Sequence, residues 1–267
     1  MSDEVAAASA YASGTVGAAN SLVGGLRLPA DKSVAHRALL LNAMAEGEAE
    51  VTVSRPGEDV LSMARVLQTL GAVESIGEGP VGYTRVRLRG GGTRQAAVLP
   101  GAGGEMLDCG NAGTAMRLLI GALSGRPARA TLIGDASLSG RPMERVAAPL
   151  RSVGAHVVTE DGHAPILVEG SRQLSATEHE LPVASAQVIG ALTIAGLAAK
   201  GLTVITAPSA WSTCAIESTS SPGRATATSH SPSAMALKSN ARCATDLSAG
   251  RRKPPTSEEA ARTVPEL

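Results

Sequence analysis

The chain has 267 residues with no Phe, two Tyr and one Trp, and its 24 basic side chains balance 24 acidic ones. So few aromatic rings argue against a base-stacking nucleic-acid module, and a net charge of zero gives no electrostatic reason for a polyanionic partner, so we expect no nucleic acid to bind. Three cysteines without a CxxC pair argue against a disulfide framework and a zinc site, and no apolar run approaches the ~20 residues that span a bilayer.

The first 90 residues contain one complete structural unit. Residues 1–22 are rich in Ala, Ser and Gly without a period, which is typical of a weakly ordered arm. The pattern then predicts a strand at 26–28, a helix at 34–45, a strand at 50–54, a helix at 58–70, and strands at 72–76 and 83–88.

Residues 104–170 repeat that order. They predict a strand at 106–108, a helix at 114–123, a strand at 128–133, a helix at 141–153, and strands at 155–158 and 165–168. Pro142 suits the first turn of the second helix, and Asp161-Gly162 is a turn signal between the last two strands. Two such blocks indicate one supersecondary unit used repeatedly.

A third unit begins at about residue 179 and stops half built. It predicts a strand at 181–183, a helix at 188–199 and a strand at 203–205. From about Trp211 the sequence is a mixture of Ser, Thr, Ala, Pro and Arg with no period. Residues 211–267 are therefore either a disordered tail or a non-native segment, for example from a reading-frame change. Sequencing the source locus would decide between them.

These patterns predict an α/β (α+β) fold with one domain over residues 23–210. Its repeated βαβαββ units span about 23–90, 104–170 and 179–210, and the third is incomplete. Asp3 and Glu4 stand where a signal peptide would carry lysines, so we expect a cytoplasmic protein that does not associate with membranes.

Each unit contains a junction at which a strand or turn opens directly into a helix. The segments are PADKSVAHR at 29–37, GNAGTAMR at 110–117 and ASAQ at 184–187. Backbone amides at a helix N-terminus are unpaired and lie at the positive end of the helix dipole, so small residues there allow an anion to approach. One such junction is a weak signal, whereas three at equivalent positions predict one anionic site.

These three segments, together with GDASLSGRPM at 134–143, resemble the signature segments of the 5-enolpyruvylshikimate-3-phosphate synthase family. The resemblance covers about residues 23–209 and the N-terminal half of a family member. It implies transfer of the enolpyruvyl group of phosphoenolpyruvate to the 5-hydroxyl of shikimate 3-phosphate, a step of aromatic amino acid biosynthesis, without cofactor or metal. It also implies a monomer with the inside-out barrel architecture of enolpyruvyl transferases, built from two similar domains.

The resemblance assigns roles to eight residues. Lys32 would contact phosphoenolpyruvate and stabilise charge in the tetrahedral intermediate, and Ser33 and Arg37 would hold shikimate 3-phosphate. Gly113 would let phosphoenolpyruvate approach the backbone, Thr114 would cap its helix, and Arg141 would bind the phosphoenolpyruvate phosphate. Ser185 and Gln187 would contact both substrates, although Ala186 stands where many members have a second serine. The ordinary structural alternatives are a solvated lysine, a helix cap at Ser33, and exposed helix arginines.

In this family the general acid and base carboxylates come from the C-terminal domain, so we expect the chain to be truncated and to have negligible turnover alone. Two alternatives stay open: a non-catalytic anion-binding half-domain that needs a C-terminal partner, and a UDP-N-acetylglucosamine enolpyruvyl transferase. Gly77–Gly82 spells GxGxxG, but its place between two strands indicates a hairpin loop. Cys109 is expected to be a buried thiol and not a nucleophile, and His36 a polar helix residue near the site.

Overall fold

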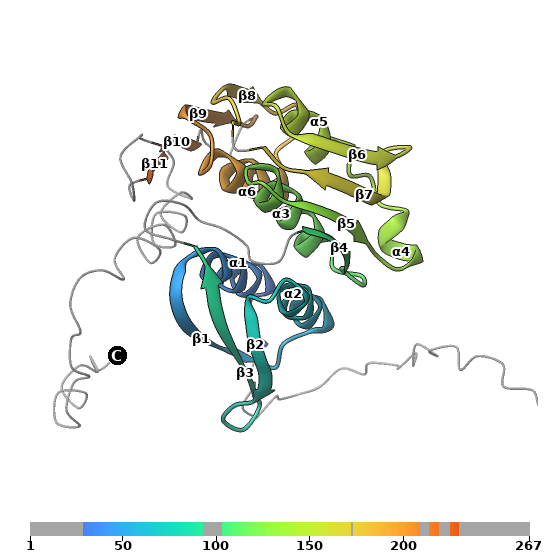
Figure 1. The fold of residues 1–267 in the computed structure, drawn as a ribbon, viewed down its shortest axis with the longest axis vertical. Helices are drawn as coiled ribbons and strands as arrows, with labels where there is room; N and C mark the ends of the chain where they lie inside the picture. The colour runs from blue at the N-terminus through green and yellow to red at the C-terminus, as the bar shows by residue number, and fades with distance from the viewer. Residues whose placement is uncertain (1–28, 93–102, 172, 209–213, 219–224, 230–267) are drawn as a thin grey trace, which may run out of the picture.

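The computed structural model describes residues 29–92, 103–171 and 173–208, and the backbone of two strands at 214–218 and 225–229. The helices are α1 (Lys32–Met44), α2 (Glu58–Thr69), α3 (Gly113–Ser124), α4 (Ala136–Ser139), α5 (Glu144–Ser152) and α6 (Ala186–Gly196). The strands are β1 (Glu46–Ser54), β2 (Val73–Glu78), β3 (Tyr83–Gly91), β4 (Gly103–Asp108), β5 (Arg129–Ile133), β6 (His156–Glu160), β7 (His163–Glu169), β8 (Glu178–Glu180), β9 (Gly201–Thr206), β10 (Cys214–Ser218) and β11 (Ala225–Ser229). They form three sheets in a mixed α/β fold (Figure 1). The predicted arm, the strand predicted at 26–28 and most of the predicted tail lie outside the described residues.

The first sheet has the order β1-β3-β2, and both pairs are antiparallel. Strand β3 alternates, with Val86 and Leu88 buried towards the helices. On its exposed face three arginines form ion pairs of 2.8–3.3 Å with glutamates of β1 and β2. This two-residue period is that of a half-buried strand, and the helices and strands predicted for residues 34–88 of the first unit are confirmed.

The second sheet has the order β4-β5-β7-β6, in which β4 and β5 are parallel and the other pairs antiparallel. The parallel pair requires a crossover, which α3 supplies. Asp161 and Gly162 both have positive φ, 49° and 81°, as a two-residue turn of type I′ requires. The order β1-β3-β2 of the first unit matches β5-β7-β6 of the second.

The helix predicted at 141–153 is wrong at its start. Helix α5 begins at Glu144, and the four-residue α4 precedes it. A residue before proline is disfavoured in helical conformation, which affects Arg141 because Pro142 follows it. The N–H of Met143 then donates to the carbonyl of Gly162 at 2.8 Å. Arg141 therefore lies in the connection between α4 and α5.

The third sheet has the order β11-β10-β9-β8, with β8 parallel to β9. The strand predicted at 181–183 is wrong, because Pro182 cannot donate to a ladder and the pairing segment is β8, three residues earlier. Within the predicted tail, the backbone of 214–218 forms β10, which is antiparallel to β9, and that of 225–229 forms β11, which is antiparallel to β10. The backbone N–H and C=O groups of an edge strand can pair with almost any extended segment. The sequences of these two strands therefore need no alternation of apolar residues.

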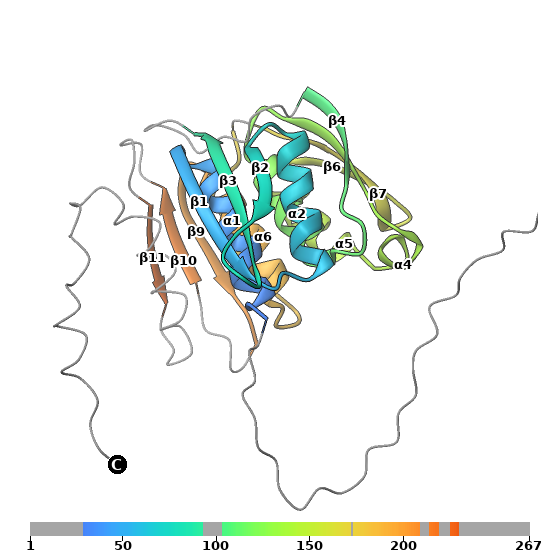
Figure 2. The same cartoon turned by 90° about the horizontal axis from the view of Figure 1, so that it is seen from below.

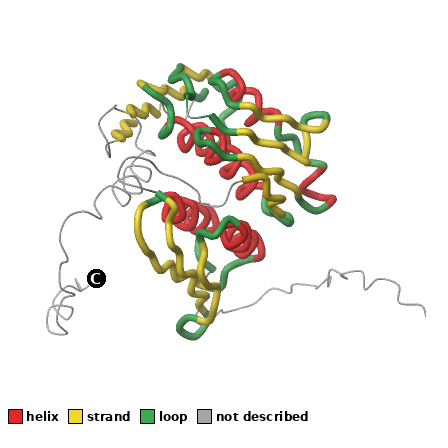
Figure 3. Tube along the Cα trace, in the orientation of Figure 1, coloured by secondary structure: helices red, strands yellow, loops and turns green. Residues whose placement is uncertain are grey.

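Helices α1, α2, α3 and α6 lie towards the centre of the molecule and the sheets lie towards the outside (Figures 2 and 3). In α3 every residue except Thr114 is buried, which makes it the central helix. Helix α6 crosses it closely: a methyl group on Gly121 would lie 2.2 Å from the carbonyl oxygen of Ala191. No helix among the described residues is both long and apolar enough to cross a membrane.

Candidate active site

The N-terminus of α1 carries the first group of the site. Asp31 caps this helix, because its Oδ1 accepts the N–H of Val34 at 2.9 Å, so the capping alternative for Ser33 is wrong. Lys32 is the first helical residue, and its exposed Nζ lies 3.3 Å from Oδ2 of Asp59 in the first turn of α2. An exposed ion pair contributes little to stability, so this ammonium group can exchange the carboxylate for another anion.

His36 lies between the first turns of α1 and α2, beside the ion pair of Lys32 and Asp59. Its Nδ1 lies 2.5 Å from the carbonyl oxygen of Lys32, and its Nε2 lies 3.1 Å from that of Asp59. Burial lowers the pKa of His36, and this outweighs the opposing effect of the two carbonyl oxygens. His36 is thus a buried polar residue beside the site, as expected, and it fixes the distance between Lys32 and Asp59.

Arg37 brings α1 close to α6. Its Nη1 donates to the carbonyl of Ser33 at 3.2 Å. Its Nη2 lies 3.9 Å from the position that a methyl group on Gly190 of α6 would take. The guanidinium of Arg37 therefore lies within van der Waals range of α6 at Gly190.

The N-terminus of α3 begins at Gly113, after a turn in which Gly110 has a φ of 53°. The prediction that Thr114 caps this helix is wrong. The cap residue is Ala112, which has no side-chain acceptor, and Thr114 is the second helical residue. First-turn N–H groups of α3 consequently have no side-chain cap, which is the condition under which a helix N-terminus binds an anion.

Arg141 reaches this N-terminus from the α4–α5 connection. Its Nη2 donates to Oδ1 of Asn111 and, at 3.3 Å, to Oγ of Ser137, and its Nη1 donates to the carbonyl of Asn111 at 3.4 Å. The Asn111 amide in turn donates to Oδ2 of Asp135 at 2.7 Å. The N–H of Leu138 and the amide of Asn111 lower the pKa of Asp135, which stays ionised and orients Asn111 towards Arg141.

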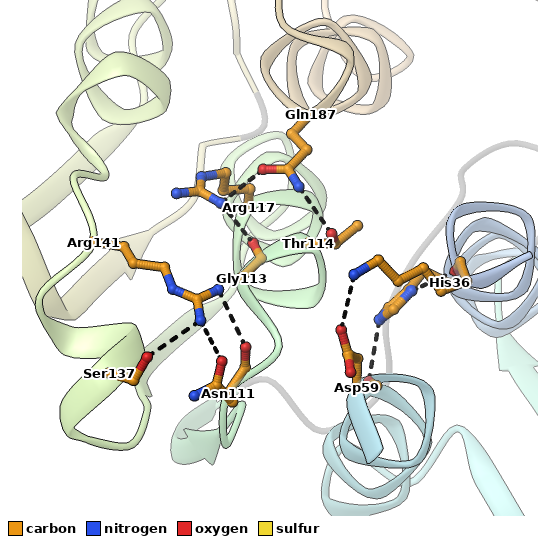
Figure 4. A network of polar contacts seen from close by, with 10 residues as sticks. His36, Asp59, Asn111, Gly113, Thr114, Arg117, Ser137, Arg141 and Gln187 are labelled. Carbon is orange, nitrogen blue, oxygen red and sulfur yellow. Dashed lines mark hydrogen bonds and ion pairs between the residues drawn. The ribbon is translucent and has the colours of Figure 1, made fainter. Parts of the chain in front are cut away.

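Helix α6 supplies the third N-terminus. Its cap is Ser185, whose Oγ accepts the N–H of Val188 at 3.5 Å. Gln187 crosses to α3: its Nε2 donates to Oγ1 of Thr114 at 2.9 Å, and its Oε1 accepts from Nη1 of Arg117 at 2.7 Å. Figure 4 shows Gln187, Thr114, Gly113 and Arg141 gathered around Arg117, with His36 and Asp59 beside them.

The structure therefore brings the predicted residues together from three helices and one connection. Gly113, Thr114, Arg141 and Gln187 lie in one network, Lys32, Ser33 and Arg37 lie on α1, and Ser185 caps α6. Four polar residues that support them had no predicted role: Asp59, Asn111, Arg117 and Asp135. Asn111 and Arg117 lie inside the segment GNAGTAMR at 110–117. They are polar residues at an otherwise apolar helix junction, and this is the signal that could have identified them.

The chemistry of this arrangement is that of an anion-binding site. Its side chains present ammonium, guanidinium, amide and hydroxyl donors, and its backbone presents helix N-termini. Within the described residues no three His, Cys, Asp or Glu side chains lie close enough to hold a metal ion. Cys109 is fully buried, and burial raises its pKa to about 12, so it is a neutral thiol and not a nucleophile.

A family model described as EPSP synthase (3-phosphoshikimate 1-carboxyvinyltransferase) matches residues 16–221. This match begins within the predicted arm and extends beyond residue 210.

Curated relatives carry the same description. The 3-phosphoshikimate 1-carboxyvinyltransferase of Acidithiobacillus ferrooxidans is 47% identical over 191 residues, which are 70% of this chain and 41% of the relative. That of Thermus thermophilus is 50% identical over 190 residues, with 70% of this chain and 42% of the relative covered. An EPSP synthase structure from Acinetobacter baumannii superposes with a TM-score of 0.59 at 41% identity, covering 69% of this chain and 40% of the other. The chain thus spans about 41% of the length of the relatives that it matches.

Proposed function

The chain belongs to the EPSP synthase family, and on that premise we propose that its helix N-termini bind shikimate 3-phosphate and phosphoenolpyruvate for enolpyruvyl transfer to the 5-hydroxyl of the sugar. The single observation that carries this proposal is the hydrogen-bond network that joins the N-termini of α3 and α6, with the first turn of α1 beside it (Figure 4). Both substrates are phosphorylated anions that carry a carboxylate. Fixed donors that are oriented before the substrates arrive suit such ligands and stabilise the charge that develops during transfer.

The proposed roles follow the positions of the side chains. Ser33, Arg37 and Ser185 hold shikimate 3-phosphate, while Gly113, Thr114, Arg141 and Gln187 hold phosphoenolpyruvate, with Gln187 close enough to serve both. Lys32 stabilises the tetrahedral intermediate, for which its ammonium group exchanges Asp59 for substrate oxygen atoms. Asn111 and Asp135 support Arg141.

We propose the inside-out barrel architecture of enolpyruvyl transferases for residues 23–210, with an incomplete third unit. The matching strand orders of the first two units and the inward position of the helices support it. In this arrangement each unit directs one helix N-terminus to the same end of the domain. The arm at 1–22 and the domain at 23–210 are part of this proposal, and the segment at 211–267 adds β10 and β11 to the third sheet.

Isothermal titration calorimetry with shikimate 3-phosphate tests the binding role. The unmodified chain should bind it, and Arg37→Met should weaken binding by about 10- to 100-fold, since hydrogen bonds to charged groups contribute about 1.5–3 kcal/mol. Lys200→Ala is the control, because this lysine is exposed beyond the C-terminal end of α6. Binding that is absent in the unmodified chain, or equally weakened by Lys200→Ala, contradicts the proposal.

A second candidate follows from the share of the relatives that the chain covers, about 41%. As a half-domain, it would bind anions and become active only when a C-terminal domain of a relative is added. Mixing the two fragments and measuring phosphate release tests this candidate: activity that appears only in the mixture supports complementation, and a mixture without activity contradicts it.

A further inference from the structure

Arg117 is a buried arginine with no carboxylate partner among the described residues. Its side chain is 4% exposed, and its donors reach the carbonyls of Gly113 and Pro142 at 3.4 and 3.3 Å and Oε1 of Gln187 at 2.7 Å. Its Nε is buried without a hydrogen-bond partner. Burial and the guanidinium groups of Arg145 and Arg141 lower its pKa to about 10, so it remains charged at neutral pH. A buried charge without a counterion destabilises a fold. The presence of Arg117 at this position is therefore better explained by a contribution to function than by a contribution to stability.

The chemistry of Arg117 fixes the orientation of the Gln187 amide. A guanidinium group has only donors, so the oxygen of the amide must face it. The amide nitrogen therefore faces Thr114, and one of its hydrogens is used by Oγ1 of that residue. Because Oγ1 accepts this bond, the Thr114 hydroxyl is free to donate its own hydrogen.

Two hydrogens are left over from this chain of bonds, the second N–H of Gln187 and the O–H of Thr114. Both are donors, and both are suited to anionic oxygen atoms. With the amide turned around, Oε1 would accept the Thr114 hydroxyl hydrogen, and the pair would present fewer donors to an anion.

We propose that Arg117 is a positioning residue that sets the donor polarity of the Gln187–Thr114 pair and so prepares it for the anionic oxygens of the substrates. This rests on the proposed function for the identity of the substrates, but the orientation of Gln187 does not depend on it. Arg117 itself need not touch the ligand for this role, since Nη1 donates to Gly113 and Gln187 and Nη2 donates to Pro142.

The variant Gln187→Glu separates an effect on stability from an effect on ligand binding. This change places a carboxylate beside the uncompensated guanidinium, so we expect the midpoint of thermal unfolding to rise or stay unchanged. The same change removes the amide donors and adds negative charge where the anion binds, so we expect binding of shikimate 3-phosphate, alone or with phosphoenolpyruvate, to fall by at least about 100-fold. Loss of binding in a variant that folds well would show that the ligand needs the amide donors of Gln187, and the contribution of Arg117 to their orientation is then measured separately.

The orientation is tested by the side-chain amide signals of Gln187 in ¹⁵N-labelled protein, assigned by their loss in Gln187→Met. In the unmodified chain the two amide hydrogens should be distinct and slow to exchange with water. In Arg117→Met they should become similar and exchange faster, while Arg117→Lys, which keeps a donor-only group, should retain part of the difference. Arg126→Met is the matched control, because Arg126 is 5% exposed on the segment at the other end of α3 and should leave these signals unchanged.

The binding role is tested by a double-mutant cycle. If Arg117 acts through Gln187, the pair Arg117→Met and Gln187→Met should weaken binding no more than Gln187→Met alone. Additive losses, or Gln187 amide signals that do not change in Arg117→Met, overturn the proposal, and so does full binding by Gln187→Glu. An unmodified chain that binds neither substrate overturns the proposed function instead, and the amide signals still decide the orientation.

Discussion

Gly113 shows how a single hydrogen atom in place of a side chain shapes the site. A methyl group there would lie 3.0 Å from Nη1 of Arg117, 3.2 Å from Nη1 of Arg141 and 3.4 Å from Cδ1 of Leu138. Two of these neighbours are the far ends of flexible side chains, which can move at little expense to the fold. The moved groups are Arg141, the proposed phosphate ligand, and Arg117, the proposed positioning residue of Gln187.

We therefore predict that Gly113→Ala changes ligand binding more than stability. The affinity for phosphoenolpyruvate, measured calorimetrically in the presence of shikimate 3-phosphate, should fall by about 10-fold or more, the effect of losing one hydrogen bond to a charged group. The free energy of unfolding should change by less than about 1 kcal/mol, as is usual outside strained or packed positions. Gly77→Ala is the control, because a methyl group at Gly77 meets nothing within 4 Å. A large loss of stability with unchanged affinity would show that Gly113 serves packing.

His179 links stability to pH. It is 8% exposed and lines a small cavity with Leu150, Leu192 and Thr203, and burial lowers its pKa from 6.5. The unfolded chain takes up a proton as the pH falls below about 6.5, whereas the folded chain resists it until a lower pH. Stability should therefore decrease as the pH falls through this window, and His36 acts with the same sign.

Replacing His179 by Leu removes one of these two contributions. We predict that the free energy of unfolding, measured by urea denaturation between pH 7.5 and 5, falls less steeply in His179→Leu than in the unmodified chain. Identical slopes in the two proteins would mean that His179 takes up its proton equally well in both states.

At the scale of residues, the sequence motifs predicted which helix ends form the candidate site, but not the hydrogen bonds between them. Lys32, Arg37, Gly113 and Gln187 were identifiable because their segments resemble a family. The observed caps are Asp31 and Ala112, whereas Ser33 and Thr114 lie inside their helices. The position of a cap depends on where the backbone leaves its extended conformation. The polar character of Arg117 in an apolar segment marks it locally, but its role depends on Gln187, seventy positions later.

At the scale of elements, the crossing of α3 and α6 holds the site together, since Gln187 and Thr114 meet only if these helices stay close. Gly121 allows the approach, because a methyl group there would lie 2.2 Å from the carbonyl oxygen of Ala191 and 2.8 Å from its Cα. Those atoms belong to the backbone and cannot rotate away. The two helices would have to separate.

We predict that Gly121→Ala destabilises the protein by about 1–3 kcal/mol, as overpacking of a tight core does, despite the better helix propensity of alanine. Urea denaturation gives the value, and Gly77→Ala again provides the comparison. A stabilised Gly121→Ala variant would show that helix propensity outweighs the close contact.

Elements with a strong period were predictable, and elements fixed by pairing were not. Helices α1, α2, α3 and α6 follow from their apolar periods and their ends. The start of α5 depended on Pro142 and on a bond from Met143 to Gly162, and β8 depended on which residues face β9. Strands β10 and β11 have no period of their own, since the open edge of β9 provides the partner of β10, and β10 that of β11.

At the scale of the whole molecule, the donors collected at one end of the domain need a facing surface for catalysis. The described residues offer no unpaired carboxylate within the network of Arg117, Arg141 and Gln187 that could transfer a proton. General acid–base catalysis typically contributes about 10²- to 10⁴-fold.

We therefore predict negligible turnover by the chain alone, measured as phosphate release with both substrates in protein purified free of host enzyme. Turnover that depends on both substrates and disappears in Lys32→Ala would contradict this prediction.

The central claim is that the N-termini of α1, α3 and α6 form one site. Titration of the ¹⁵N-labelled chain with shikimate 3-phosphate, followed by backbone amide shifts, tests it directly. We predict that the amides of Ser33, Thr114 and Gln187 shift together with one dissociation constant, while that of the exposed Lys200 does not move. Shifts confined to one helix, or different dissociation constants for the three, would contradict a single site.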